Sequence, residues 1–116
     1  MDDLAQFLRA RLDEDEQTAR RAGDSFRQIG KTGVIVSTEG DRAEECATAN
    51  WAGIAEHIVR HDPARVLAEV DAKRQLIDWV LRWPMRPHAP SSVDGILERL
   101  ALPYADHADY RDEWRP

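Results

Sequence analysis

Two histidines stand four residues apart, a spacing that lets two imidazoles face one metal ion when the segment is helical. His57 and His61 form this pair, and zinc sites use the same spacing. A zinc site needs one or two more ligands, which Asp62, His88 or His107 supplies only if the fold brings it near. The catalytic pattern His-Glu-x-x-His is absent, because no glutamate follows His57. The competing interpretation is that both histidines flank a helix end and bond its terminal carbonyl groups.

A second chemical pattern is the run of Gly30, Lys31 and Thr32, which matches the end of a phosphate-binding loop. The full pattern requires a glycine five residues earlier, where this chain has Ser25, and a helix immediately afterwards. The β-branched residues 34–36 follow instead. The segment therefore predicts a hairpin turn and not a nucleotide site.

Acidic residues and the single thiol offer no catalytic arrangement. The four consecutive acids at 13–16 point in different directions on a helix, which predicts a solvated helix face. Cys46 follows Glu44 and Glu45, and nearby negative charge opposes ionisation of the thiol. We expect Cys46 to be a small, half-buried side chain. No catalytic or cofactor-binding residue is identified, no cofactor is expected, and a non-enzymatic protein is favoured.

Aromatic and arginine residues are the strongest remaining candidates for function. The chain has four tryptophans, and Trp79 and Trp83 share a helix face at i,i+4 spacing. Such residues fill the cores of small domains, and they also concentrate at binding hot spots. Core and interface therefore stay open as interpretations. The candidate interaction residues are Trp79, Trp83, Arg86, Tyr104, His107, Tyr110, Arg111 and Trp114.

The elements that must position these residues follow from hydrophobic periodicity. Leu4, Leu8 and Leu12 lie on one stripe of a first helix, which Gly23 ends. The stripes of the first and third helices are expected to pack together. The predicted elements are helices over 2–22, 49–61 and 63–82, a β-hairpin or small three-stranded meander over 26–47, a proline-containing connector over 83–91, a short helix over 92–102 and an aromatic, acidic tail over 103–116.

Start signals and charge pairs refine these boundaries. Asp62 suits the N-cap and Pro63 the first position of the third helix. Thr48 or Asn50 is expected to cap the second helix. A helical turn is expected near 108–114. Pairs expected along the helices include Arg9–Asp13, Glu16–Arg20, Arg65–Glu69 and Arg74–Asp78.

Composition bounds the class of protein. The 116 residues are 42% hydrophobic and 33% charged, which is typical of one soluble globular domain. One cysteine permits no intrachain disulfide. The acidic start and the short apolar runs predict neither a secretory signal nor a membrane span, so a cytoplasmic protein is expected. The net charge of −6 disfavours nucleic acid as a partner. The expected fold is mainly α and borders on α+β, with three main helices, a short C-terminal helix and a β-hairpin between helices 1 and 2.

Three stretches resemble a protein family. They are residues 1–16, residues 57–74 with the run HIVRHDPARVL, and residues 100–114 with the run LPYADH. In these stretches the chain resembles the uncharacterised actinobacterial and actinophage proteins of domain-of-unknown-function family 6221. The resemblance implies source and size class but no activity. Many such relatives carry Cys and His residues resembling metal ligands before the Leu-Pro-Tyr tail. Here residues 83–92 hold one histidine and no cysteine, so no metal site is carried over.

Three functions follow from these patterns. The first is a non-enzymatic protein-interaction or accessory module, related to phage or mobile elements, whose partner is a protein, with self-association included. The alternative is a metal-binding protein or metal-dependent enzyme that uses His57 and His61. The third, which the acidic charge disfavours, is a regulator associated with nucleic acid.

Overall fold

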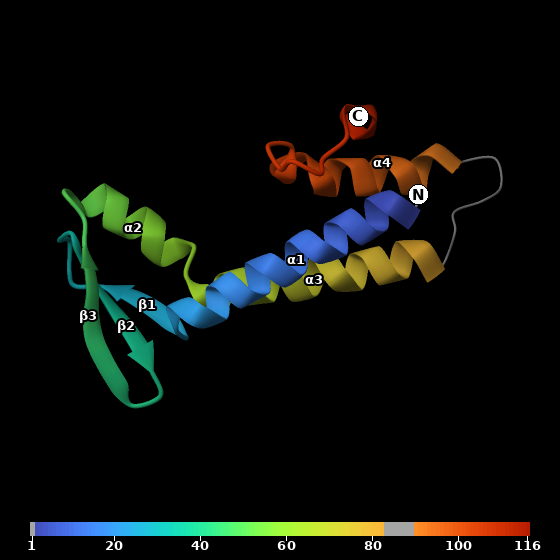
Figure 1. Ribbon diagram of the computed structural model, residues 1–116. Coiled ribbons are helices and arrows are strands. Elements are labelled where there is room, and N and C mark those ends of the chain that lie inside the picture. Colours follow the sequence, from blue (N-terminus) through green and yellow to red (C-terminus); the bar gives the residue numbers. More distant parts are fainter. Residues whose placement is uncertain (1, 83–89) are drawn as a thin grey trace. The chain divides into compact units, whose positions relative to one another are not determined.

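The computed structural model describes residues 2–82 and 90–116, in which helices dominate and one small sheet follows the first helix and precedes the second along the chain (Figure 1). The elements are α1 (Asp2–Ala22), β1 (Ser25–Gln28), β2 (Val34–Glu39), β3 (Arg42–Thr48), α2 (Ala52–Arg60), α3 (Pro63–Arg82), α4 (Pro90–Ala101) and the 3-10 turns η1 (Leu102–Tyr104) and η2 (Asp112–Trp114). The mainly helical class is confirmed.

The chain forms two compact units. Met1–Glu14 and Val70–Pro116 form one, called the helical unit, and Asp15–Glu69 form the other, called the sheet unit. The single domain expected from the chain length stays a prediction.

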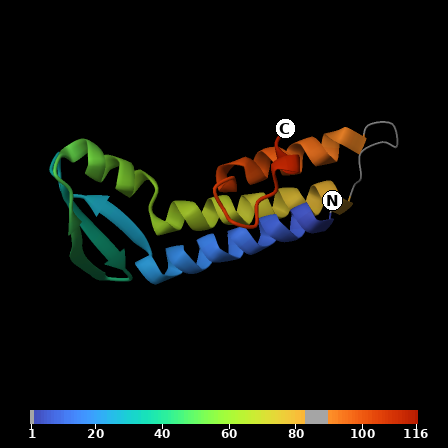
Figure 2. The same ribbon diagram turned by 45° about the horizontal axis from the view of Figure 1, so that its top comes forward.

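The helical unit is built on apolar residues from three helices. Within it, the first half of α1 and the second half of α3 run side by side (Figures 1 and 2). Each of the three helices buries apolar side chains almost completely, which is the main source of stability for a small domain. These side chains are Leu4, Leu8 and Leu12 of α1, Val70, Ile77 and Val80 of α3, and Leu97 and Ala101 of α4.

Charged residues of α1 and α3 pair both along and between the helices. The predicted pairs Glu16–Arg20 and Arg65–Glu69 are confirmed, at 2.8 and 3.0 Å. Arg9 Nη2 lies 2.9 Å from Asp78 Oδ1, and Arg74 Nη2 lies 2.6 Å from Asp13 Oδ1. Arg9 and Arg74 thus exchange the partners that the sequence predicted, because the neighbouring helix also offers a carboxylate within reach of each guanidinium. These exposed pairs contribute about 0–1 kcal/mol each.

The end of the helical unit differs in detail from the prediction. Helix α4 begins at Pro90 and not at Ser92, because proline fits the first turn of a helix, where its missing N–H has no partner to lose. The helical turn expected near 108–114 is shorter and covers Asp112–Trp114. Of the predicted connector, 83–89 lies outside the described residues.

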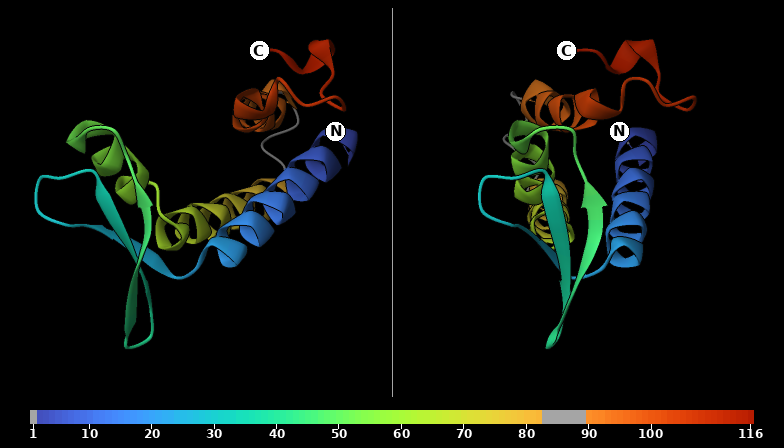
Figure 3. Two further views of the ribbon diagram at one scale, coloured as in Figure 1. Left: turned by 60° about the vertical axis from the view of Figure 1, so that its left-hand side comes forward. Right: turned by 90° about the vertical axis from the view of Figure 1, so that its left-hand side faces the viewer.

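The sheet unit contains three antiparallel strands in the order β1-β2-β3 (Figure 3). Of the two predicted alternatives, the three-stranded meander is the one observed. It contains the expected hairpin and one further strand. Strand β2 continues to Glu39, and Thr38 pairs with both Ser25 and Ala43. The turn falls at Gly40, whose φ of +60° suits glycine.

Helix α2 packs on β1 and β2 of this sheet, and Ile35 and Ala55 are completely buried. The helix starts at Ala52 and not at residue 49 as predicted. Ala49 N–H donates to the Gly33 carbonyl at 2.8 Å, so residue 49 is bound to the β1–β2 loop. The predicted caps are also wrong, since Trp51 occupies the N-cap position without a side-chain hydrogen bond.

Asp62 begins α3 as predicted and has a second role. Its Oδ1 accepts the Arg65 N–H at 3.0 Å, which is the expected N-cap bond. Its Oδ2 accepts the Phe26 N–H of β1 at 3.1 Å. One carboxylate thus fixes both the start of the helix and the position of the first strand.

At Gly33 the β1–β2 loop approaches residue 49 so closely that a side chain has no room. An added Cβ at Gly33 would lie 2.0 Å from the Ala49 carbonyl oxygen, whereas nothing lies within 4 Å of a Cβ at Gly30. Urea unfolding should therefore show a loss of about 2–4 kcal/mol for Gly33→Ala, from backbone displacement and a weakened hydrogen bond. Gly30→Ala should lose only about 1 kcal/mol, from the positive φ alone. The reverse order would contradict this close approach.

Candidate protein-interaction site

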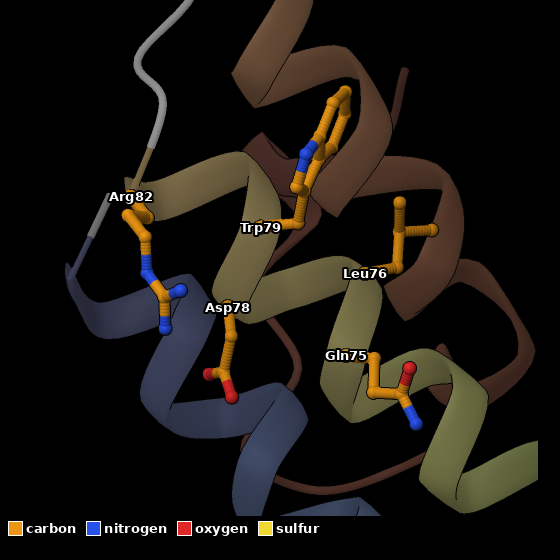
Figure 4. A pocket seen from close by; sticks show the side chains of 5 residues that line it. All are labelled: Gln75, Leu76, Asp78, Trp79 and Arg82. Atoms are coloured by element: carbon orange, nitrogen blue, oxygen red, sulfur yellow. The ribbon is translucent and has the colours of Figure 1, made fainter.

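A hollow with a volume of about 460 Å³ lies on α3 in the described part of the helical unit. Trp79 is 56% exposed and Leu76 is 37% exposed, so both leave apolar surface in contact with water. These two side chains point to one side of the helix, and Asp78 and Arg82 point to the other (Figure 4). The lining residues are Gln75, Leu76, Asp78, Trp79 and Arg82.

The heptad-like spacing of α3 explains why these side chains are left outside. Ile77 and Val80 are buried, at 1% exposure each. Leu76 and Trp79 are three residues apart, so they form a pair on a neighbouring face that the core does not cover. The apolar surface of α3 therefore extends beyond the part of the helix that is buried in the helical unit.

The polar residues at the hollow differ in whether they are already paired. Asp78 accepts a hydrogen bond from Arg9, and the Gln75 amide nitrogen donates to Asp71 at 2.8 Å. Arg82 is exposed and makes no ion pair with another described residue. Tryptophan and arginine are residue types enriched at binding hot spots.

Four of the predicted interaction residues form a different structure, an aromatic cluster around Phe7 of α1. The ring centroids of Tyr104, His107, Tyr110 and Trp114 lie 6.5, 5.6, 5.9 and 5.1 Å from that of Phe7. Each of the four is half-buried. Their contacts hold the C-terminal tail on α1 within the helical unit.

Arg11 is the charged member of this cluster, and sequence reasoning did not single it out. It is 8% exposed, and its guanidinium lies 5.0 Å from the Phe7 ring centroid. Its Nη1 lies 2.8 Å from His107 Nδ1, and its Nη2 donates to Glu14 Oε1 at 3.0 Å. A buried charge requires such partners. The available signal was its position between Leu8 and Leu12, on the edge of the apolar stripe.

The other predicted interaction residues lie in different settings. Arg111 is exposed, binds Asp3 Oδ2 at 3.1 Å and covers the Trp114 ring at 5.3 Å. Trp83 and Arg86 lie outside the described residues. Among the described candidates, Trp79 is thus the one that combines an apolar ring with substantial exposure.

The two candidate metal ligands lie close together at the end of α2. The imidazole centroids of His57 and His61 are 4.5 Å apart, and His61 Nδ1 donates to the His57 carbonyl oxygen at 2.9 Å. That bond is the helix-end contact the competing interpretation expected. Within 2–82 and 90–116, no group of three metal-binding side chains occurs. Asp62 caps α3, His107 contacts Arg11, and His88 lies outside the described residues.

The remaining sequence patterns have structural positions. Gly30, Lys31 and Thr32 lie in the turn between β1 and β2, and a strand follows them in place of the helix that a phosphate loop needs. The prediction for Cys46 is wrong, since it is exposed. Every residue of β3 is exposed, because α2 packs on the other two strands.

The fold is that of a small, mainly helical protein with a three-stranded antiparallel sheet inserted between its first two helices. In the described part of the chain, no helix combines the length and apolar character that crossing a membrane requires. The chain belongs to a family of unknown function, DUF6221, whose model matches residues 1–116. No curated protein and no solved structure matches the chain. The match confirms the family resemblance seen in the sequence.

Proposed function

We propose that the protein is a non-enzymatic interaction module that binds a protein partner at the hollow on α3. The observation that supports this most directly is the exposure of Trp79 beside Leu76. Burying a tryptophan against a partner removes a large apolar surface from water, which stabilises the complex. A partner that covers both side chains would complete the apolar circumference of α3.

The chemistry of the hollow suggests the chemistry of the partner. Trp79 and Leu76 favour an apolar side chain, and Arg82 favours a carboxylate placed at the rim of the contact. A nucleic acid partner is disfavoured, because the net charge of −6 repels phosphates.

The proposal also includes the biological setting in which the protein acts. The resemblance to actinobacterial and actinophage proteins supports an accessory protein of phage or mobile-element origin. A cytoplasmic location would suit such a role.

Affinity capture with immobilised protein tests this proposal. From an actinobacterial lysate, the wild-type chain should capture a reproducible partner, measured by quantitative mass spectrometry. Trp79→Ala should reduce recovery by about 30-fold or more, since hot-spot truncations cost about 2 kcal/mol or more. Trp51→Ala is the matched control, because Trp51 is equally accessible at 63% exposure but belongs to the sheet unit.

Two results would overturn the proposal. One is equal recovery of the same partners by the wild type and Trp79→Ala. The other is loss of recovery with Trp51→Ala but not with Trp79→Ala, which would place the interface on the sheet unit. Circular dichroism of both variants should match the wild type, since both rings are mostly exposed.

A further inference from the structure

The exposed flank of α2 carries a pair of imidazoles that the proposed function does not use. His57 and His61 are both exposed and lie one helical turn apart. Their ring planes differ by 38° and their centroids are 4.5 Å apart, so the two rings occupy one small region of the surface. Two imidazoles in this arrangement can act together as a chelate for one divalent metal ion.

The hydrogen bond of His61 fixes the tautomer of its ring in a form that can bind a metal ion. Because Nδ1 donates its proton to the His57 carbonyl oxygen at 2.9 Å, the lone pair of the neutral ring lies on Nε2. Metal-binding histidines commonly donate the second ring N–H to a backbone carbonyl, which fixes the tautomer and the ring orientation. The His57 ring makes no hydrogen bond within the described residues, so both its nitrogens are available.

A single chain supplies only half of a zinc site here. Structural zinc takes four ligands in a tetrahedron, and no third metal-binding side chain joins the pair in the described parts of this chain. We propose that His57 and His61 bind Zn²⁺ together with the same two histidines of a second copy. Such an arrangement has twofold symmetry, which is the commonest symmetry of protein dimers.

The surroundings of the pair favour a second copy over water as the source of the missing ligands. Ile58 is 36% exposed, and Ile54 lies three residues before His57 on the same flank of α2. Two such flanks facing each other would bury apolar surface beside the metal. Zinc would supply the additional free energy that this small apolar strip lacks.

The mass of the untagged protein in solution tests this inference. With about one Zn²⁺ for every two chains and a reducing agent, light scattering should show a change from 13.2 kDa to twice that mass. Excess chelator should reverse the change. His57→Ala and His61→Ala should each stay monomeric at the same zinc concentration, and titration calorimetry of the wild type should give one zinc ion per two chains.

A relocated pair provides the control. The double variant His57→Ala with Arg60→His keeps the number of histidines but places them at adjacent positions, about 100° apart on the helix. It should not dimerise, whereas Trp79→Ala should dimerise like the wild type. Failure of the wild type to change mass with zinc, or zinc-dependent dimers of the relocated variant, would refute the shared site. Because Trp79 is not involved, either outcome leaves the proposed interaction module separately testable.

Discussion

Phe7→Ala should lower the free energy of unfolding by about 3–5 kcal/mol, which is typical of truncating a buried aromatic side chain. Phe7 is 7% exposed and is the ring that every other aromatic of the cluster contacts. Its loss leaves a cavity and also removes edge-to-face contacts worth about 0.5–1.5 kcal/mol each. Small domains are stable by only about 5–15 kcal/mol, so this variant should be close to unfolded at 37 °C.

Urea unfolding monitored by circular dichroism measures this loss, and Phe7→Leu is the matched variant. Leucine keeps most of the apolar volume but has no ring, so its smaller loss isolates the contribution of the aromatic contacts. A loss below about 1 kcal/mol for Phe7→Ala would mean that the C-terminal tail does not depend on this ring.

Ile35→Ala is the corresponding change in the sheet unit and should cost about 2–5 kcal/mol. Ile35 lies in the middle strand with no exposed surface, and α2 packs on that strand. Removing the side chain takes away buried apolar surface from the strand on which α2 packs. Amide hydrogen exchange should show faster exchange throughout α2 as well as in β2, because the helix loses its contact with the sheet.

Ile35→Val provides the graded comparison, with an expected loss of about 0.5–1.5 kcal/mol for one methylene. Equal stability of the alanine and valine variants would show that this position tolerates a cavity. Unchanged exchange in α2 would show that the helix does not depend on Ile35 for its position.

The long helices could be predicted because their boundaries are encoded locally. Helices α1 and α3 have the predicted bounds, 2–22 and 63–82. Asp62 and Pro63 give the start of α3 directly, since a cap and a first-turn proline act over a few residues. The strand at 34–36 was also indicated, because β-branched residues stand there between turns, whereas the number of its partner strands stayed open between a hairpin and a meander.

Features that depend on distant partners could not be predicted in the same way. Helix α2 begins later than predicted because the Ala49 N–H donates to the Gly33 carbonyl, and no local pattern indicates that bond. Arg9 and Arg74 found partners on the neighbouring helix, at a position that only the packed structure defines.

The candidate site was predicted in part for the same reason. The sequence could not separate the aromatic residues that pack on Phe7 from Trp79, because both groups have the composition of a core and of an interface. Exposure, which depends on the packed helices, separates them.

The thiol on β3 has a practical consequence. Cys46 is the chain's only cysteine, and it is exposed on a strand in the sheet unit. A maleimide dye or nitroxide would attach there in one-to-one ratio without any substitution. The sheet unit thus comes with its own spectroscopic handle, which reports on that unit alone when denaturant or a ligand is added.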